Sequence, residues 1–281
     1  MLITPEGNIC ILGLNEGNNT MKMKGKRVLV YGAAGGLGSS ICRLFIEKGC
    51  EVVMCGRNYE KLADLNERWG TACEVKSFSI LDEIDPMIFA EVDAVINAAG
   101  MDIRKPLSRQ SQAEIRAQLD VNLFGAINLT KSALHSFSRK GSGQILHIGG
   151  FADGSWTMPY YTVDIATRAG MYSFIESVNL EIDNKEITVQ YFCPQPADTD
   201  AERPFHELWK RQGLEIVSSE KVAEDIFISL ERSREVTIQG PYLNRIVSTK
   251  LKYLFPRLMK ILFIKPMGRM TMSYLDSKGS K

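Results

Sequence analysis

The sequence predicts an α/β fold in which one doubly wound parallel sheet of about seven strands carries helices on both faces. Short apolar segments of strand length alternate strictly with helical patterns, and a glycine-rich turn directly follows the first of these strands. The chain has 281 residues, of which 44% are hydrophobic, so it is long enough for one large domain with a substantial core. These features are typical of a single Rossmann-type domain.

The expected strands are spread along most of the chain. They lie near residues 27–31, 51–55, 73–78, 93–97, 144–148, 187–192 and 235–239. Helical patterns fill most of the intervals, so parallel strands joined by crossover helices are expected.

The turn after the first strand predicts a phosphate-binding site. It contains Gly32, Gly36, Leu37 and Gly38 and precedes a helical pattern over 39–48. Glycines at this spacing make a tight turn and let the backbone approach a pyrophosphate, whose charge is met by free N–H groups at the helix start. We therefore expect this turn to bind a dinucleotide.

The second strand indicates which dinucleotide is preferred. It ends at Gly56 and Arg57, where a dinucleotide site reads the adenosine ribose. An acidic residue there would favour NAD, whereas a glycine leaves room and an arginine offers a planar cation to a 2′-phosphate. NADP(H) is the expected cofactor; the alternative is that Arg57 is simply a solvated loop cation.

Composition narrows the class of protein. The formal net charge is +1, the six cysteines form no C-x-x-C pair, and the three histidines have no metal-ligand spacing. We therefore expect reduced cysteines, a cytoplasmic location and no metal site. The early apolar residues are broken by polar ones, so no signal peptide or spanning segment is expected, and residues 1–23 are interpreted as a flexible extension or a start-site artefact.

Further motifs resemble the short-chain dehydrogenase/reductase family over residues 25–240. The sequence YGAAGGLG is similar to the family's glycine motif, and INAAG at 96–100 is similar to its N-A-G motif. VNLFG carries the family's helix asparagine, and CPQPADTD resembles its P-G-x-x-x-T loop with glutamine replacing glycine. The resemblance implies cofactor contacts from Asn97, Ala98, Gly100, Pro194 and Thr199, and a catalytic place for Asn122. It also implies one NADP-binding domain over 24–240, a small-molecule substrate and a homo-oligomer, dimer or tetramer.

The family's catalytic Ser, Tyr and Lys are not all present. An ungapped alignment of the helical pattern over 164–181 places Asp164 at the Tyr position and Arg168 at the Lys position. The Ser position then falls on Gly150 or Phe151. A rival register makes Tyr161 catalytic, but it needs three extra residues inside the helix, which rotate it by about 300°. The ungapped register is favoured.

Two interpretations of Asp164 and Arg168 stay open. As an exposed i, i+4 ion pair they would contribute only about 0.3 to 0.5 kcal/mol. As pocket residues, Arg168 would lie near the ribose and Asp164 beside the substrate. We expect Arg168 to lower the pKa of Asp164, which would suit a base or a cation-binding carboxylate. Tyr160 and Tyr161 would supply a phenolic donor or pack under the loop.

The segment near 200–218 lies where the family places a mobile substrate lid. Phe205, Leu208 and Trp209 give it an apolar face, which would suit a hydrophobic or aromatic substrate or would pack the lid on the domain. His206 is a weak catalytic candidate.

The last segment, 241–281, carries nine basic residues and one acidic residue, a net charge of +8, which leaves −7 for the rest of the chain. Leucines and a phenylalanine at helical spacing predict a basic amphipathic helix interrupted at Pro256. It would contact a membrane surface, an acidic partner, its own domain or a sister subunit. Nucleic acid is not expected, since no recognition motif accompanies the charge.

These features favour an atypical NADP(H)-dependent oxidoreductase with a rebuilt catalytic site. Two alternatives remain: a non-redox isomerase, dehydratase or cyclase on the same fold, and a non-catalytic cofactor-binding accessory protein. The cofactor motifs favour a working pocket, whereas the substitutions at the Ser, Tyr and Lys positions disfavour ordinary carbonyl reduction.

Overall fold

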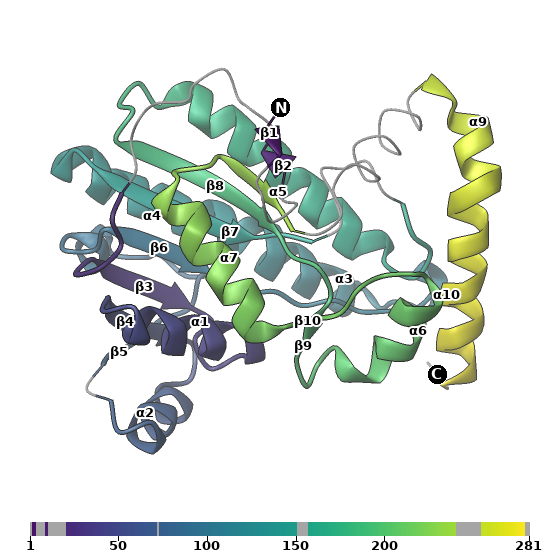
Figure 1. The fold of residues 1–281 in the computed structure, drawn as a ribbon, viewed down its shortest axis with the longest axis horizontal. Coiled ribbons are helices and arrows are strands. Elements are labelled where there is room, and N and C mark those ends of the chain that lie inside the picture. Colours follow the sequence, from purple (N-terminus) through teal and green to yellow (C-terminus); the bar gives the residue numbers. More distant parts are fainter. Residues whose placement is uncertain are drawn as a thin grey trace.

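A seven-stranded parallel sheet forms the centre of the computed structural model, which describes residues 2–3, 9–10, 21–71, 73–150, 157–239 and 254–278 (Figure 1). Its strand order is β11-β8-β7-β6-β3-β4-β5, and every pairing is parallel. The strands are β3 (Arg27–Tyr31), β4 (Glu51–Gly56), β5 (Glu74–Ser77), β6 (Ala94–Asn97), β7 (Gly143–Ile148), β8 (Ile187–Cys193) and β11 (Val236–Ile238). The predicted doubly wound sheet is confirmed.

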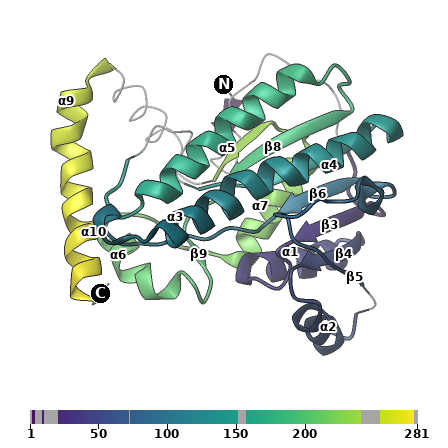
Figure 2. The same ribbon diagram turned by 180° about the vertical axis from the view of Figure 1, so that it is seen from behind.

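Helices cover both faces of the sheet, because alternate residues of the buried strands point to opposite sides. Val28 and Val30 face a core built with α1 (Gly36–Glu47) and α7 (Ser219–Glu231). Leu29 between them faces a second core built with α4 (Gly125–Lys140) and α5 (Thr162–Glu181). Figure 2 shows α4 and α5 side by side across the second face.

The remaining elements connect or border these layers. They are α2 (Tyr59–Arg68), α3 (Gln112–Leu119), a π-turn (Asp120–Phe124), α6 (His206–Arg211) and 3₁₀ turns at Pro86–Phe89, Leu107–Arg109 and Arg203–Phe205. Two small sheets pair β1 (Leu2–Ile3) with β2 (Ile9–Cys10) and β9 (Ala197–Asp198) with β10 (Val217–Ser218).

The packed domain starts earlier than residue 24, the boundary expected from the sequence. The N–H of Met21 donates to the carbonyl of Glu231 at 3.0 Å, and Met23 is fully buried. The apolar side chain of Met23 belongs to the core of α1 and α7, so these residues are part of the domain. Most of the expected extension lies outside the described residues.

The chain after the sheet ends in a helical column at the edge of the molecule, drawn yellow in Figures 1 and 2. It comprises α9 (Pro256–Met259), a π-turn (Lys260–Ile264) and α10 (Lys265–Ser277), and α10 lies against α6. In the described part of the chain, no helix is both long and apolar enough to cross a bilayer. Of the expected basic segment, residues 241–253 and 279–281 lie outside the described residues.

The strand order reverses between β3 and β6, since β4 and β5 lie on one side of β3 and β6 to β11 on the other. In open α/β sheets, ligands bind at the carboxyl ends of the strands beside this reversal. The loops after β3, β6, β7 and β8 therefore border the candidate site.

Candidate functional site

The turn after β3 has no room for a side chain at two of its glycines. Gly32 has φ +87°, and a Cβ there would lie 2.9 Å from the backbone N of Ala99. A Cβ on Gly38 would lie 2.1 Å from the carbonyl oxygen of Gly32, so a side chain would force the turn open. Helix α1 begins inside the turn, at Gly36 and not at residue 39, because these glycines let the helical backbone pass close to the strand end.

The start of α1 is open to a ligand. Its N-cap residue, Gly35, provides no side-chain acceptor for the N–H groups of the first turn, to which Gly36, Leu37 and Gly38 belong. Gly36 is exposed, and a Cβ there would lie 3.0 Å from Cβ of Thr199. The loop after β8 therefore reaches the helix start at Thr199. Pro194, half-buried, directly follows β8.

Arg57 lies where β4 ends, at the rim of this site. Its side chain is exposed, and its carbonyl accepts a hydrogen bond from Ser77 Oγ at 3.1 Å. A Cβ on the preceding Gly56 would lie 3.5 Å from Leu62. The strand end thus presents a cation and no carboxylate between β4 and α2.

The loop after β6 is anchored by a buried histidine that sequence reasoning had not assigned a role. Asn97 Nδ2 donates to Nδ1 of His147 at 3.1 Å, and Asn97 Oδ1 accepts from the N–H of Ala99 at 3.1 Å. His147 Nε2 lies 2.7 Å from Oγ1 of Thr130, whose hydroxyl donates to a helix carbonyl. Burial lowers the pKa of His147 to about 4, so the ring is neutral and orients Asn97, Ala98 and the following loop.

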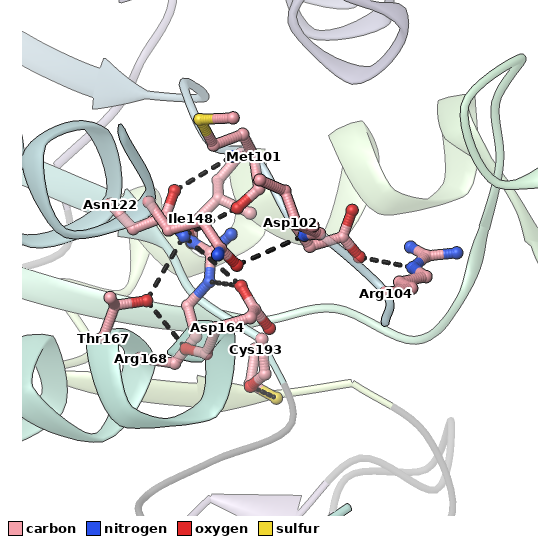
Figure 3. A network of polar contacts seen from close by, with 12 residues as sticks. Met101, Asp102, Arg104, Asn122, Ile148, Asp164, Thr167, Arg168 and Cys193 are labelled. Atoms are coloured by element: carbon pink, nitrogen blue, oxygen red, sulfur yellow. Dashed lines mark hydrogen bonds and ion pairs between the residues drawn. The ribbon is translucent and has the colours of Figure 1, made fainter. Parts of the chain in front are cut away.

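Asn122 joins that loop to α5 (Figure 3). Its Oδ1 accepts from the N–H of Met101 at 2.9 Å, and its Nδ2 donates to the Met101 carbonyl at 2.7 Å. Nδ2 also lies 3.3 Å from Oδ1 of Asp164 and 3.2 Å from Oγ1 of Thr167. The π-turn at Asp120–Phe124 carries this asparagine, and such turns are frequent at functional sites.

Asp164 and Arg168 form a pair that is nearly buried. Arg168 Nε donates to Oδ1 of Asp164 at 3.2 Å, and each side chain is only 12% exposed. Arg168 Nη1 donates to the carbonyl of Ile148, the last residue of β7, at 3.1 Å. The interpretation as an exposed surface pair is therefore wrong: the arginine spans from α5 to the end of the sheet.

The expected fall in the pKa of Asp164 is also wrong. Burial raises this pKa and outweighs the attraction of Arg168, while the charge of Asp102 raises it further. Desolvation disfavours the charged carboxylate, and the cations of Arg168 and Arg104 do not offset it. Asp164 is thus better suited to hold a proton than the sequence alone suggested.

The end of β7 has no hydroxyl at Gly150, one of the two residues aligned with the family's serine; Phe151, the other, lies outside the described residues. Tyr191, on β8, fills the adjacent space, since a Cβ on Gly149 would lie 2.1 Å from its Cζ. The backbone N–H of Gly150 donates to Tyr191 Oη at 3.2 Å, and Cys193 Sγ donates to the Gly150 carbonyl at 2.7 Å. Sequence reasoning missed Tyr191, whose position depends on the glycine pair opposite it.

Tyr161 makes no side-chain hydrogen bond to Asn122, Asp164 or Arg168 in the described part of the chain. It precedes α5 as the N-cap residue, and its ring centroid is 6.1 Å from that of Trp209. Its Oη is buried and has no hydrogen-bond partner among the described residues. Burial raises the pKa of Tyr161, so the phenol stays protonated as a potential donor.

Arg104 connects the loop after β6 to the predicted lid, and sequence reasoning missed it. Its guanidinium Cζ lies 3.8 Å from the ring centroid of Phe205, and Nε donates to Asp102 at 2.5 Å. Nη2 pairs with Glu202, whereas Nη1 is buried without a hydrogen-bond partner in the described part of the chain. Burial alone would lower the pKa of Arg104, but Asp102 and Glu202 raise it, so the side chain stays charged.

The lid residues serve packing to a large extent. Leu208 and Trp209 are buried in a cluster with Tyr160, Tyr161, Tyr274 and Leu275. Phe205 is half-buried, and Nε2 of His206 lies 3.9 Å from Asp198. Gln195 lies where the family motif has a glycine. Its side chain donates to Glu215 at 3.3 Å and so ties the loop after β8 to the last part of the lid segment. In the ranges that the structure describes, no cluster of metal-ligating side chains occurs.

A comparison with protein families decides the classification. The model of the short chain dehydrogenase family matches residues 26–208. The chain belongs to this family.

Relatives agree with the family assignment. Dehydrogenase/reductase SDR family member 7B of Rattus norvegicus is 26% identical over 82% of this chain and 78% of its own length. An SDR family protein 7-like dehydrogenase/reductase of Drosophila melanogaster is 27% identical over 62% of this chain, a match that spans only 57% of that protein.

Solved structures share the fold. A short chain dehydrogenase of Burkholderia cenocepacia in complex with NADP has a TM-score of 0.72 at 19% identity, covering 87% of this chain and 99% of its own. A gluconate 5-dehydrogenase of the same organism, in complex with NADP and tartrate, has a TM-score of 0.70 at 20% identity, covering 81% and 98%.

Proposed function

We propose that the protein is an NADP(H)-dependent oxidoreductase acting on a small hydrophobic or aromatic molecule, with Asp164 and Arg168 in place of the family's tyrosine and lysine. One observation carries this proposal. Oδ1 of Asp164 accepts hydrogen bonds from both Asn122 and Arg168 inside one nearly buried network at the ends of β6 and β7. A carboxyl group with a perturbed pKa and two fixed polar partners is the kind of group that active sites use for proton transfer.

The described residues fit the proposed cofactor. The open start of α1 suits a pyrophosphate, Arg57 suits a 2′-phosphate, and Gly100 and Arg168 border the space between β6 and β7. Solved relatives of the same fold contain NADP. When bound, a nicotinamide dinucleotide supplies or accepts the hydride.

Asp164 would handle the proton of the reaction. In the reducing direction its carboxyl group gives a proton to the substrate oxygen as the carbonyl becomes an alcohol, and in the oxidising direction the carboxylate takes it back. Arg168 holds Asp164 in place and offers its cation to the ribose. The phenol of Tyr161, buried and unpartnered in the described residues, is the second candidate donor.

Calorimetry with NADPH and NADH tests the first half of the proposal. We expect NADPH to bind more tightly and Gly36→Val to abolish binding, because its side chain would press on Thr199 and fill the space of the pyrophosphate. Absence of binding to the folded wild-type protein would overturn the proposal.

Turnover tests the second half. NADPH oxidation with a panel of hydrophobic and aromatic aldehydes and ketones should depend on Asp164, and simple ketones should react slowly, because each lost hydroxyl donor costs roughly 10² to 10³ in rate. Binding without redox turnover on any of them would favour the isomerase, dehydratase or cyclase alternative, or an accessory role. We further propose a cytoplasmic homo-oligomer, whose size light scattering would measure.

A further inference from the structure

The helical column of residues 254–278 has two unlike sides. Its inner side consists of the buried residues Met259, Gly268, Thr271, Tyr274 and Leu275. Tyr274 and Leu275 pack with the lid residues Leu208 and Trp209, and Gly268 lies against Pro159, before α5. Its outer side exposes large apolar side chains: Leu254 at 71%, Phe255 at 53%, Leu258 at 52%, Ile261 at 59% and Leu262 at 55%. Five such residues within one short segment form an apolar strip that the described domain does not cover.

Basic residues accompany the apolar strip. Arg257, Lys260, Lys265 and Arg269 are all exposed on the same column. The one acidic residue, Asp276, accepts a hydrogen bond from Tyr160 Oη at 2.9 Å and so lies on the inner side. The exposed surface of the column is therefore both apolar and positively charged.

We propose that this outer side lies on an anionic lipid surface, with the apolar strip below the headgroups and the basic side chains among them. An interfacial helix requires this combination, and it does not need to span the bilayer. A second copy of the chain is a poorer occupant, since a symmetric contact would bring two sets of four cations together. An acidic protein would pair with the basic residues, but it would not explain why the leucines and Ile261 are so strongly exposed.

The surface is connected to the lid of the proposed active site. Tyr274 Oη donates to the carbonyl of Pro204 at 2.6 Å, and Gln212 Nε2 donates to Thr271 Oγ1 at 2.8 Å. The column thus holds the lid at Pro204 and Gln212. If the proposed function holds, the lid opens beside the membrane, and the substrate is a lipophilic molecule that partitions into it.

Co-sedimentation of the full-length protein with lipid vesicles tests the proposal. We expect binding to phosphatidylcholine vesicles that contain phosphatidylserine, little binding to pure phosphatidylcholine, and weakening by salt. Replacing Arg257, Lys260 and Lys265 together by Gln should weaken binding roughly a hundredfold, since each basic residue near an anionic surface contributes about a factor of five. Leu258→Ser combined with Ile261→Ser should weaken it at least about tenfold.

Leu180→Ser is the matched control, because Leu180 is 88% exposed on α5, away from the column. It should bind vesicles as the wild type does. Absence of wild-type binding to anionic vesicles would overturn the proposal, as would a dimer in light scattering that only the Leu258 and Ile261 changes dissociate. Vesicle binding requires no turnover, so this test remains informative even if the proposed reaction is wrong.

Discussion

A glycine at position 100 makes the position of Arg168 possible. A Cβ on Gly100 would lie 2.8 Å from Nη2 of Arg168, inside the contact distance of the two atoms. The guanidinium thus occupies the space beside the loop after β6 while Nη1 bonds to the end of β7. A motif glycine that the family resemblance assigns to the cofactor also accommodates Arg168, which the ungapped register aligns with the family's lysine.

Removal of Arg168 should weaken NADPH binding. If Arg168 contacts the ribose, Arg168→Ala removes a charge-assisted hydrogen bond and lowers affinity by about one to two orders of magnitude, measured by calorimetry. Gly100→Ala should weaken binding in the same direction by displacing the guanidinium. Arg116→Ala is the control, since Arg116 is 79% exposed on α3; NADPH affinity unchanged in the Arg168 variant would contradict the assigned role.

Asp164→Asn should spare NADPH binding and abolish the reaction. The amide keeps the size and hydrogen-bonding shape of the carboxyl group but carries no proton that it can exchange. If turnover persists in Asp164→Asn, the phenol of Tyr161 is the proton donor instead. Tyr161→Phe should then abolish turnover.

Asp164→Asn should also change how the free energy of unfolding depends on pH. Because burial raises the native pKa of Asp164 above 3.8, the unfolded chain releases its proton first as the pH rises. In this window the native state holds more protons, so the free energy of unfolding falls with rising pH in the wild type. Urea unfolding should show this fall reduced in Asp164→Asn; parallel curves would contradict the raised pKa.

His147 should make the protein sensitive to acid. The unfolded chain takes up a proton near 6.5, whereas the buried ring does so only at about 4. The contribution of His147 to the free energy of unfolding is complete above pH 6.5 and is lost as the pH falls from 6.5 to about 4. The loss is about 1.4 kcal/mol per pH unit and roughly 3 kcal/mol in all. In urea unfolding, His147→Gln should lack this component and the exposed control His135→Gln should retain it.

Arg104 should stabilise the lid. Its side chain is only 8% exposed and contacts Phe205 while pairing with Glu202. Arg104→Ala removes the stacking and the ion pair together, so we expect a loss of about 1 to 3 kcal/mol and faster proteolysis near 200–213. A double-mutant cycle with Glu202→Gln should give a coupling energy above zero; additive effects would show that the pair does not hold the lid.

The strands and the glycine turn could be predicted because their signals are local. Strands buried on both faces are continuous apolar runs, and the spacing of Gly32, Gly36 and Gly38 is a property of adjacent residues. The pairing of Asp164 with Arg168 follows from helical spacing, but its burial does not, which is why the expected pKa shift had the wrong direction.

Other site residues could not be found by local reasoning. Arg104 meets Glu202 and Phe205 across about a hundred residues of chain, and the contact exists only once the lid is folded. Tyr191 fills a space that Gly149 leaves on a neighbouring strand. The strand register that places Asn97 opposite His147 was the one signal for that histidine, and it requires the sheet order.

Arg57 should determine the preference for NADP(H) over NAD(H). Its guanidinium stands exposed at the end of β4, and an arginine there pairs with a 2′-phosphate that NAD(H) lacks. Arg57→Ala should therefore lower NADPH affinity by about tenfold or more and leave NADH affinity nearly unchanged, since a charge-assisted hydrogen bond contributes about 1.5 to 3 kcal/mol. Arg68→Ala on α2, where the side chain is 65% exposed and pairs with Asp64, is the matched control. Equal loss of affinity for both cofactors would show that Arg57 acts on the fold of the loop, and unchanged affinity for both would show that it is a solvated cation.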